Sequence, residues 1–269
     1  IALARLGVST RWISRLGDDA VGDLIVRTLA AELVDVSWVS RDSSATTGAF
    51  MKIRDGGRAR VQYFRRGSAA SRLSSDDVPD AALDGVRLVH LTGITIALSD
   101  GARALVREVA ARARERGITV TFDANYRPAL WPNAAAARRA YEAALPMVDW
   151  YFCGIDEARA LWGDGALGEL ERRVADAGAR NVVIRVGELG AFTNGALVAP
   201  PRIVDVRDEV GAGDAFDAGF VFALLTGAPP AACVHAGHII AAHALAGTGD
   251  WETLPRLAEV RDMLARAGA

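Results

Sequence analysis

Short apolar runs alternate with amphipathic helical stretches through the middle of the chain. Four of these runs are typical of buried strands, and they cover residues 87–91, 118–122, 150–153 and 182–186. Helical patterns lie between them, around 99–116, 134–144 and 168–177. This order predicts an α/β fold in which a mainly parallel sheet is covered by helices on both faces. Ligands of such folds bind at the carboxyl ends of the strands.

One segment interrupts the alternation. Residues 46–53 and 59–65 are two strand-like runs joined by an Asp-Gly-Gly sequence at 55–57, which is a hairpin signal. We therefore predict a small antiparallel β lid, at about 37–66, outside the parallel sheet but within a single domain that spans 1–269.

Alternation along the two lid strands predicts which side chains share a face. We expect Ala49, Met51, Ile53, Val61 and Tyr63 on one side of their strands, with Phe50, Gln62 and Phe64 on the other. A two-stranded ribbon is marginal alone, so we expect two lids to cover one another in a homodimer or a higher homo-oligomer. The alternative is a monomer whose lid folds over its own site.

The run Gly211-Ala212-Gly213-Asp214 comes just before an apolar helical stretch at 216–225. Two glycines let a ligand approach the backbone closely, and first-turn N–H groups of a helix attract anions. Asp214 would lie in that first turn, where a carboxylate is a candidate general base for a hydroxyl that attacks a phosphoryl group. Alternatively, Asp214 only caps the helix and the glycines only form a turn.

Composition restricts the remaining function classes. The 269 residues are 51% hydrophobic and 24% charged, with a net charge of −2, so we expect an enzyme-sized core and neither nucleic acid nor a membrane as partner. Two cysteines make no disulfide framework, and we expect a cytoplasmic protein. The only lysine, Lys52, follows Met51, which excludes a Gly-Lys-Ser/Thr phosphate loop.

The sequence Val-Gly-Ala-Gly-Asp-Ala-Phe at 210–216, followed by Ala-Gly-Phe, resembles the C-terminal signature of the ribokinase-like (PfkB) carbohydrate kinases. The resemblance implies a three-layer α/β/α sandwich with a β lid. It also implies that Asp214 is the catalytic base and that Gly211, Ala212 and Gly213 bind the transferred phosphate. In that family a first strand and a Gly-Gly/Asn turn would precede Ile1.

Further segments are similar to the 2-keto-3-deoxygluconate kinases of this family. They include Tyr-Phe-Arg at 63–65, Asp-Ala-Asn-Tyr-Arg at 123–127 and Gly-Asp-Trp-Glu at 249–252. The resemblance implies that Tyr63, Arg65 and Arg127, together with Phe50 and Asp214, hold a sugar acid. Guanidinium groups suit a carboxylate, which a neutral sugar lacks. Alternatively, Arg65 only shields a strand edge and Arg127 only pairs with Asp123.

Nucleotide and metal sites follow from the same resemblance. Gly187 and Gly190 match the family's Gly-x-x-Gly turn near the ATP phosphates, although such a turn commonly just begins a hairpin. Glu157 matches an acid that acts on Mg²⁺ through water, but Gly154 stands where the family has Asn. Asp156 and Glu157 could equally be first-turn acids that stabilise a helix dipole.

Together with these features, the resemblance implies ATP- and Mg²⁺-dependent phosphorylation of the terminal hydroxyl of 2-keto-3-deoxygluconate. Two alternatives remain from the sequence: another PfkB sugar kinase, similar to fructokinase or ribokinase, and a catalytically silent sugar-binding paralogue. The substitution at Gly154 favours the second alternative. The sequence does not distinguish the gluconate epimer of the substrate from the galactonate epimer.

Overall fold

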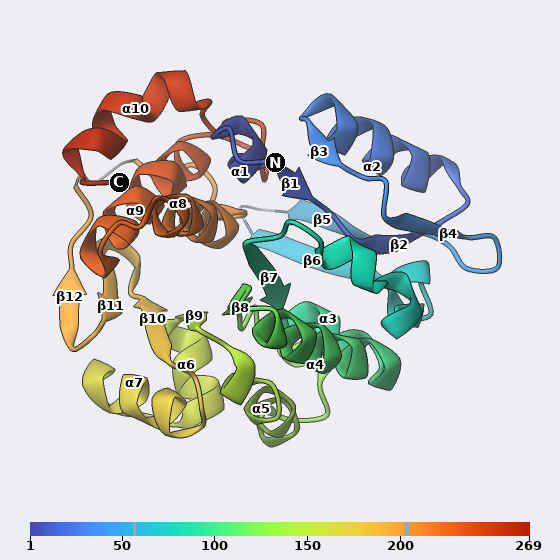
Figure 1. Cartoon of the computed structure of the whole chain (residues 1–269), viewed down its shortest axis with the longest axis horizontal. Helices are drawn as coiled ribbons and strands as arrows, with labels where there is room; N and C mark the ends of the chain where they lie inside the picture. The colour runs from blue at the N-terminus through green and yellow to red at the C-terminus, as the bar shows by residue number, and fades with distance from the viewer. Residues whose placement is uncertain (56–57, 202–204) are drawn as a thin grey trace.

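The computed structural model describes residues 1–55, 58–201 and 205–269. A six-stranded sheet has the order β12-β11-β10-β9-β8-β7 (Figure 1). Its strands are β7 (Leu88–Thr92), β8 (Thr119–Asp123), β9 (Trp150–Gly154), β10 (Asn181–Arg185), β11 (Ala191–Thr193) and β12 (Ala196–Val198). Strands β7 to β10 are parallel, as predicted, whereas β11 and β12 continue the sheet as an antiparallel hairpin.

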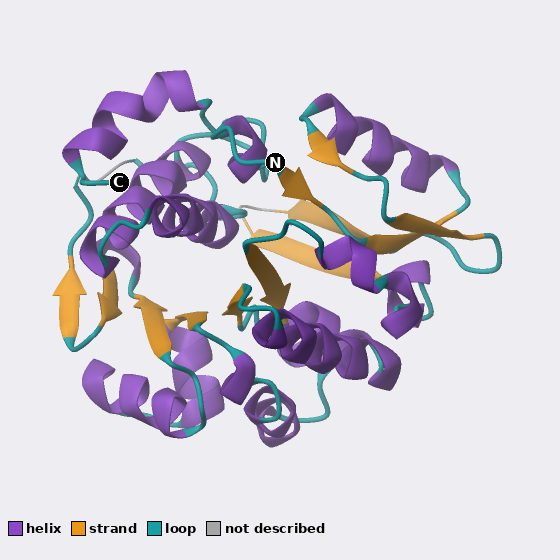
Figure 2. Ribbon diagram, in the orientation of Figure 1, coloured by secondary structure: helices purple, strands orange, loops and turns teal. Residues whose placement is uncertain are grey.

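Helices cover both faces of this sheet (Figures 1 and 2). One face packs against α3 (Gly93–Leu98), α4 (Asp100–Glu115), α5 (Ala134–Glu142), α6 (Ile155–Trp162) and α7 (Leu167–Asp176). The other packs against α1 (Ala2–Arg5), α8 (Ala212–Thr226), α9 (Pro230–Leu245) and α10 (Leu257–Arg266). The chain therefore has the predicted three-layer α/β/α architecture, with two hydrophobic cores.

Strand β9 explains why the sheet is buried on both faces. Trp150 and Phe152 belong to the core beneath α8 and α9, whereas Tyr151 and Cys153 belong to the core beneath α3 to α7. Successive strand residues point to opposite faces, so a continuous apolar run is what a strand between two helical layers requires. Phe220 of α8 packs edge-on against both inward rings of β9, with ring centroids 4.9 and 5.0 Å away.

The segment between α1 and β7 contains further strands and one more α-helix. Strand β1 (Thr10–Arg11) pairs with β3 (Val34–Asp35), β2 (Ser14–Gly17) pairs with β4 (Val39–Asp42), and α2 (Ala20–Ala31) connects the two pairs. The predicted hairpin is present as β5 (Ala49–Asp55) and β6 (Arg58–Phe64), which pair antiparallel. Its predicted turn residues Gly56 and Gly57 lie outside the described residues.

Arg5, the last residue of α1, joins segments from both ends of the chain. Its guanidinium forms a two-pronged ion pair with Glu32 at 2.8 Å and donates to the carbonyl oxygens of Trp251 and Leu254 at 3.1 and 2.6 Å. It also lies over the Trp251 ring, 5.3 Å from the centroid. Arg5 thus fixes the loop before α10, which contains Asp250.

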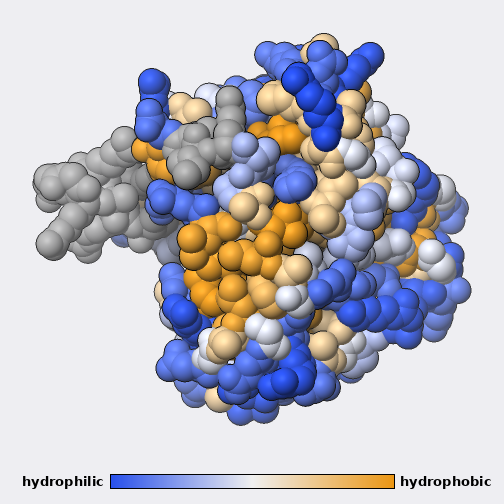
Figure 3. Space-filling view, turned by 90° about the vertical axis from the view of Figure 1, so that its left-hand side faces the viewer, coloured by the Kyte–Doolittle hydropathy of each residue, from blue (hydrophilic) through white to orange (hydrophobic). Residues whose placement is uncertain are grey.

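The surface beside β12 is apolar. Hydrophobic side chains gather on the face of the molecule where β12 forms the edge of the sheet (Figure 3), and Leu197 of β12 is 47% exposed. No helix within the described ranges is long and apolar enough to cross a membrane.

Candidate active site

The first turn of α8 lies at the centre of the candidate site. The helix begins at Ala212, four residues before the predicted apolar stretch, and Asp214 lies in its first turn as predicted. Gly211 precedes the helix with φ 78°, in the left-handed region that favours glycine. A Cβ at Gly211 would lie 2.5 Å from the Asp250 carbonyl oxygen, so glycine is required here for packing as well. First-turn N–H groups have no acceptor within the helix and can receive an anion.

Asp214 is an exposed residue in the first turn of α8. Surrounding protein atoms desolvate it, and the negative charge of Asp123 is nearby; together they raise the pKa of Asp214 above its usual range. Arg185 and Arg127 act in the opposite direction. A carboxylate with a raised pKa is a better proton acceptor, which suits a general base.

The lid strands place Phe50 and Tyr63 on one face. The two residues are directly opposite each other in the β5–β6 register, and their ring centroids are 6.2 Å apart. Opposed residues of an antiparallel pair share a face, so the prediction that grouped Tyr63 with Ala49 and Met51, and Phe50 with Phe64, was wrong. Met51 instead pairs with Gln62, and Ala49 pairs with Phe64, on the other face. The side chains of Ile53 and Val61 lie outside the described part of the chain.

Arg65 lies beside Tyr63, as the two-residue spacing predicts. Its guanidinium carbon is 4.1 Å from the centroid of the Tyr63 ring, a cation–π contact. Burial lowers the pKa of Arg65, and the positive charge of Arg127 lowers it further. The structure therefore brings Arg65 within electrostatic range of Arg127, which comes from the loop after β8.

Arg127 does not form the predicted alternative pair with Asp123. Its Nη1 lies 3.6 Å from Glu157 Oε1 and donates to the Tyr126 carbonyl at 3.2 Å, while 43% of the side chain stays exposed. Asp123 is instead paired with Arg185 at 2.8 Å. Arg127 thus keeps donors free for a ligand carboxylate.

Glu157 lies in the first turn of α6. Its two carboxylate oxygens accept hydrogen bonds from the backbone N–H groups of Gly154 and Tyr126, both at 2.7 Å. Glu157 thereby caps the helix whose preceding residue, Gly154, has no side-chain oxygen to offer. Burial, with the charge of Asp123, raises the pKa of Glu157. Glu157 therefore acts as a first-turn acid of α6, which is one of the two predicted roles. Each of its carboxylate oxygens also retains a lone pair that can accept a hydrogen bond from water.

The predicted Gly-x-x-Gly turn lies after β10. Gly187 begins a short 3-10 turn with φ 57° and nothing within 4 Å of a hypothetical Cβ. At Gly190, with φ 115°, a Cβ would lie 2.1 Å from the Val198 carbonyl oxygen. Gly190 is thus required by the approach of β12, and Gly187 leaves open backbone at the edge of the sheet where α/β folds generally bind ligands.

Arg185, the last residue of β10, is the site residue that sequence reasoning missed. Its guanidinium is bonded to Asp123 and to Asp217 of α8, at 2.8 and 2.7 Å. Burial disfavours the cation, but the two carboxylates outweigh that effect and raise the pKa of Arg185. The available signal was a charged residue at the end of an otherwise apolar strand.

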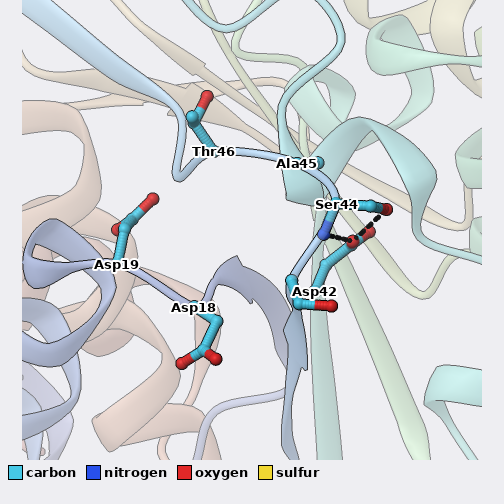
Figure 4. A pocket seen from close by; sticks show the side chains of 7 residues that line it. Asp18, Asp19, Asp42, Ser44, Ala45 and Thr46 are labelled. Atoms are coloured by element: carbon cyan, nitrogen blue, oxygen red, sulfur yellow. Dashed lines mark hydrogen bonds between the residues drawn. The ribbon is translucent and has the colours of Figure 1, made fainter.

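A separate acidic hollow of about 240 Å³ lies at the base of the lid (Figure 4). Asp42 there accepts from the backbone N–H and the hydroxyl of Ser44. Asp19 accepts from Gly22 N–H at the start of α2 and from both the N–H and the hydroxyl of Thr47, just before β5. These bonds lower the pKa of Asp19 and tie the lid to α2.

Replacing Asp19 with Ala should lower the melting temperature near neutral pH. A carboxylate whose pKa is lower in the folded protein than in the unfolded chain stabilises the folded protein. This stabilisation is complete when the pH is above the unfolded pKa, roughly 3.9, and is lost as the pH falls through the folded pKa. The melting-temperature difference from wild type should therefore shrink toward pH 3. Asp18→Ala is the matched control, because the Asp18 side chain, among the described residues, forms one ion pair, a 3.7 Å contact with Arg41. Equal losses in both variants would contradict the assignment.

Comparison with known proteins agrees with this arrangement. Residues 1–256 match the pfkB family carbohydrate kinases. The chain is 37% identical to the 2-dehydro-3-deoxygluconokinase of Thermoproteus tenax, covering 98% of this chain and 82% of the relative. It is 33% identical to the protein of that name from Bacillus subtilis (strain 168), covering 98% and 83%.

A solved structure of the PfkB protein from Polaromonas sp. JS666 superposes with a TM-score of 0.86 at 34% identity, covering 97% of this chain and 85% of that one. The fold, the glycine turn with its carboxylate and the similarity over nearly the whole of this chain all agree. The chain is a member of the pfkB family of carbohydrate kinases.

Proposed function

We propose that this protein transfers the γ-phosphoryl group of ATP to the terminal hydroxyl of 2-keto-3-deoxygluconate, giving the 6-phosphate and ADP. This sugar acid is the same compound as 2-dehydro-3-deoxygluconate, the name carried by the relatives from Thermoproteus tenax and Bacillus subtilis. Membership of the carbohydrate kinase family supports phosphoryl transfer to a sugar hydroxyl.

The observation that carries the choice of a sugar acid is that two arginines lie within electrostatic range of one another, one of them also within range of Asp214. Arg127 acts electrostatically both on Arg65 and on Asp214. Two guanidinium groups close to one another repel unless an anion lies between them, and a carboxylate accepts their paired donors. Phe50 and Tyr63 supply an apolar wall on the same face of the lid. A neutral sugar would offer these two guanidinium groups no carboxylate to bind.

The residues of α8 account for the chemistry. Asp214 takes the proton of the terminal hydroxyl as its oxygen attacks the γ-phosphorus. The backbone N–H groups of Ala212, Gly213 and Asp214, following Gly211, stabilise the negative charge that develops on the transferred group. Gly187 and Gly190 line the nucleotide side, at the end of β10. A cytoplasmic location suits this function, because ATP is available there and because Cys153 and Cys233 are buried free thiols.

Magnesium would neutralise the charge of the nucleotide phosphates. In the described ranges no three His, Cys, Asp or Glu side chains are grouped to hold a metal ion directly. The carboxylate of Glu157 fits an indirect role, because both oxygens keep lone pairs that can accept from metal-bound water. The contribution of Glu157 would thus be to orient metal-bound water.

The direct test is ADP release with ATP and Mg²⁺ over a panel of sugars and sugar acids. The gluconate and galactonate epimers of the 2-keto-3-deoxy acid should be the best acceptors, well ahead of ribose and fructose. A preference for a neutral sugar would replace this assignment with another kinase of the family. No ADP release with any acceptor, in a folded protein, would indicate a silent sugar-binding protein.

We also propose that two lids pair in a homodimer. Met51 and Phe64 on one lid face are 54% and 51% exposed, while Phe50 on the other face is 50% exposed. A two-stranded ribbon that is apolar on both faces is covered best when one face meets the substrate and the other meets a second subunit.

Light scattering at micromolar concentration should give twice the mass of one chain. Phe64→Asp should shift the protein toward the monomer, because a charge would be buried in the interface. Leu24→Asp is the control, since Leu24 is 57% exposed on α2, outside the two lid strands. A monomeric wild-type mass that persists with substrate present would refute the lid dimer.

A further inference from the structure

Arg185 lies where three elements of the site meet. From the end of β10 its Nη1 donates to Asp217 Oδ1 at 2.7 Å and to the Gly213 carbonyl at 3.2 Å, both in α8. Its Nη2 donates to Asp123 Oδ1, at the end of β8, at 2.8 Å. The side chain is 17% exposed, and each of the two carboxylate side chains is 4% exposed. One planar group thus joins β8, β10 and α8 by directed bonds.

The guanidinium of Arg185 packs directly against Gly213. A Cβ at Gly213 would lie 3.4 Å from Arg185 Nη1 and 3.5 Å from its guanidinium carbon, which is van der Waals contact. The bonded Gly213 carbonyl belongs to the peptide that leads directly into Asp214. The guanidinium therefore fixes the orientation of the peptide that carries the general base.

Stability alone does not account for a buried charged cluster. Burying an ion pair costs desolvation, and apolar residues of similar volume generally hold a core as well or better. Its neighbours in β10, Val183 and Ile184, are fully buried apolar residues of that kind. What a planar fork adds over an apolar contact is direction, since its donors fix the angle between the groups they bond.

We propose that Arg185 is a positioning residue. It holds the Gly213–Asp214 peptide in a fixed orientation relative to the end of β8. As a result, the glycine turn and the Asp214 carboxylate both face the reacting groups. The inference rests on the proposed function only in taking Asp214 as the base. Arg185 itself need not touch either substrate.

The charges that face Asp214 come from several elements. Asp123 lies on β8, Arg185 on β10, Arg127 in the loop after β8, Asp250 in the loop before α10, and Asp217 on α8 itself. Arg185→Lys keeps the positive charge among these groups but removes the fork, because one ammonium cannot reproduce the planar bonds to β8 and α8. This variant therefore separates orientation from charge.

The test is the steady-state kinetics of Arg185→Lys over a range of pH. We expect kcat to fall by roughly 10- to 10²-fold, the scale of a displaced catalytic group, with KM for ATP and for the sugar acid nearly unchanged. The acid limb of the pH profile should not move, because the charge is kept. Arg180→Lys is the matched control, since Arg180 precedes the first residue of the same strand, at the opposite edge, and pairs with Asp149. That variant should behave as wild type.

Three outcomes would overturn the inference. They are a kcat within twofold of wild type, a loss that appears in KM alone, and a loss that disappears at high pH and so reflects charge only. If Arg185→Lys does not fold, Asp217→Ala keeps the arginine and removes only its link to the side chain of α8. It should lower kcat in the same direction, and a wild-type kcat would again refute the role.

Hydrogen exchange separates this inference from the proposed function. In the protein without ligands, the amides of residues 212–217 should exchange faster in Arg185→Lys than in wild type, whichever sugar the enzyme accepts. If the wild type prefers a neutral sugar, the proposed substrate is wrong, and kcat can still be compared with that sugar. Unchanged exchange together with unchanged kcat would refute the positioning role alone.

Discussion

Asp214→Asn should lower kcat by at least ~10²-fold, which corresponds to roughly 2.7 kcal/mol of transition-state stabilisation. The substitution keeps the shape of the side chain in the first turn of α8 but removes its ability to accept the hydroxyl proton. Because burial and Asp123 raise the pKa of Asp214, wild-type kcat should fall as pH decreases through a value above the ordinary aspartate range. The variant should lose this acid limb together with its rate.

Binding is the control for this prediction. Calorimetry should give dissociation constants for ATP and the sugar acid close to those of wild type, because the N–H groups of the turn are unchanged. Asp208→Asn is not a suitable control for Asp214→Asn, because Asp208 accepts a hydrogen bond from Val210 N–H just before the glycine turn and its loss could disturb that turn. Near-normal turnover in Asp214→Asn would remove this carboxylate from the mechanism.

Arg65→Ala and Arg127→Ala should each raise KM for the sugar acid about 10- to 10²-fold. Loss of a charge-assisted contact is expected to cost about 1.5–3 kcal/mol, and the effect should be far smaller on KM for ATP. Both side chains retain donors in the structure: Arg65 is stacked on Tyr63, and Arg127 is 43% exposed. Initial rates with each substrate varied in turn measure the two constants.

The matched control for these arginines is Arg66→Ala. Arg66 is exposed and follows Arg65 directly, so the variant removes the same charge from the same segment. It should leave KM for the sugar acid unchanged. An equal loss for a neutral sugar in Arg65→Ala or Arg127→Ala would show that the arginines are structural.

The central sheet could be predicted because its signal is local. Strands such as β9, which are buried on both faces, have continuous apolar sequences that can be recognised directly. The order of strands and helices along the chain then limits the possible topologies of the sheet. The first turn of α8 was also predictable, because its glycines and its carboxylate are adjacent in sequence. The helix starts earlier than predicted, since Ala212, Gly213 and Asp214 carry no strong apolar pattern.

Features that depend on register or on distant partners were not predictable. The register of β5 against β6 decides whether Phe50 and Tyr63 lie on the same face of the lid, and a shift of one residue in that register would place them on opposite faces. Arg185 meets Asp123 across 62 residues of sequence and meets Asp217 across 32. The position of Arg185 at the end of β10 does not indicate either partner in the sequence, so the cluster is visible only in the folded chain.

The ion pair and carbonyl contacts of Arg5 have a consequence for the order in which the protein is made. Arg5 and Trp251 are 246 residues apart, so at ribosomal speeds of about 5–20 residues per second Arg5 waits roughly 10–50 s for that loop. The loop backbone at Asp250 lies against Gly211, the residue that precedes α8. A nascent chain can therefore complete its sheet and most of its helices before this loop is made, and the surroundings of the first turn of α8 are complete only once the loop has folded against Gly211 and Arg5.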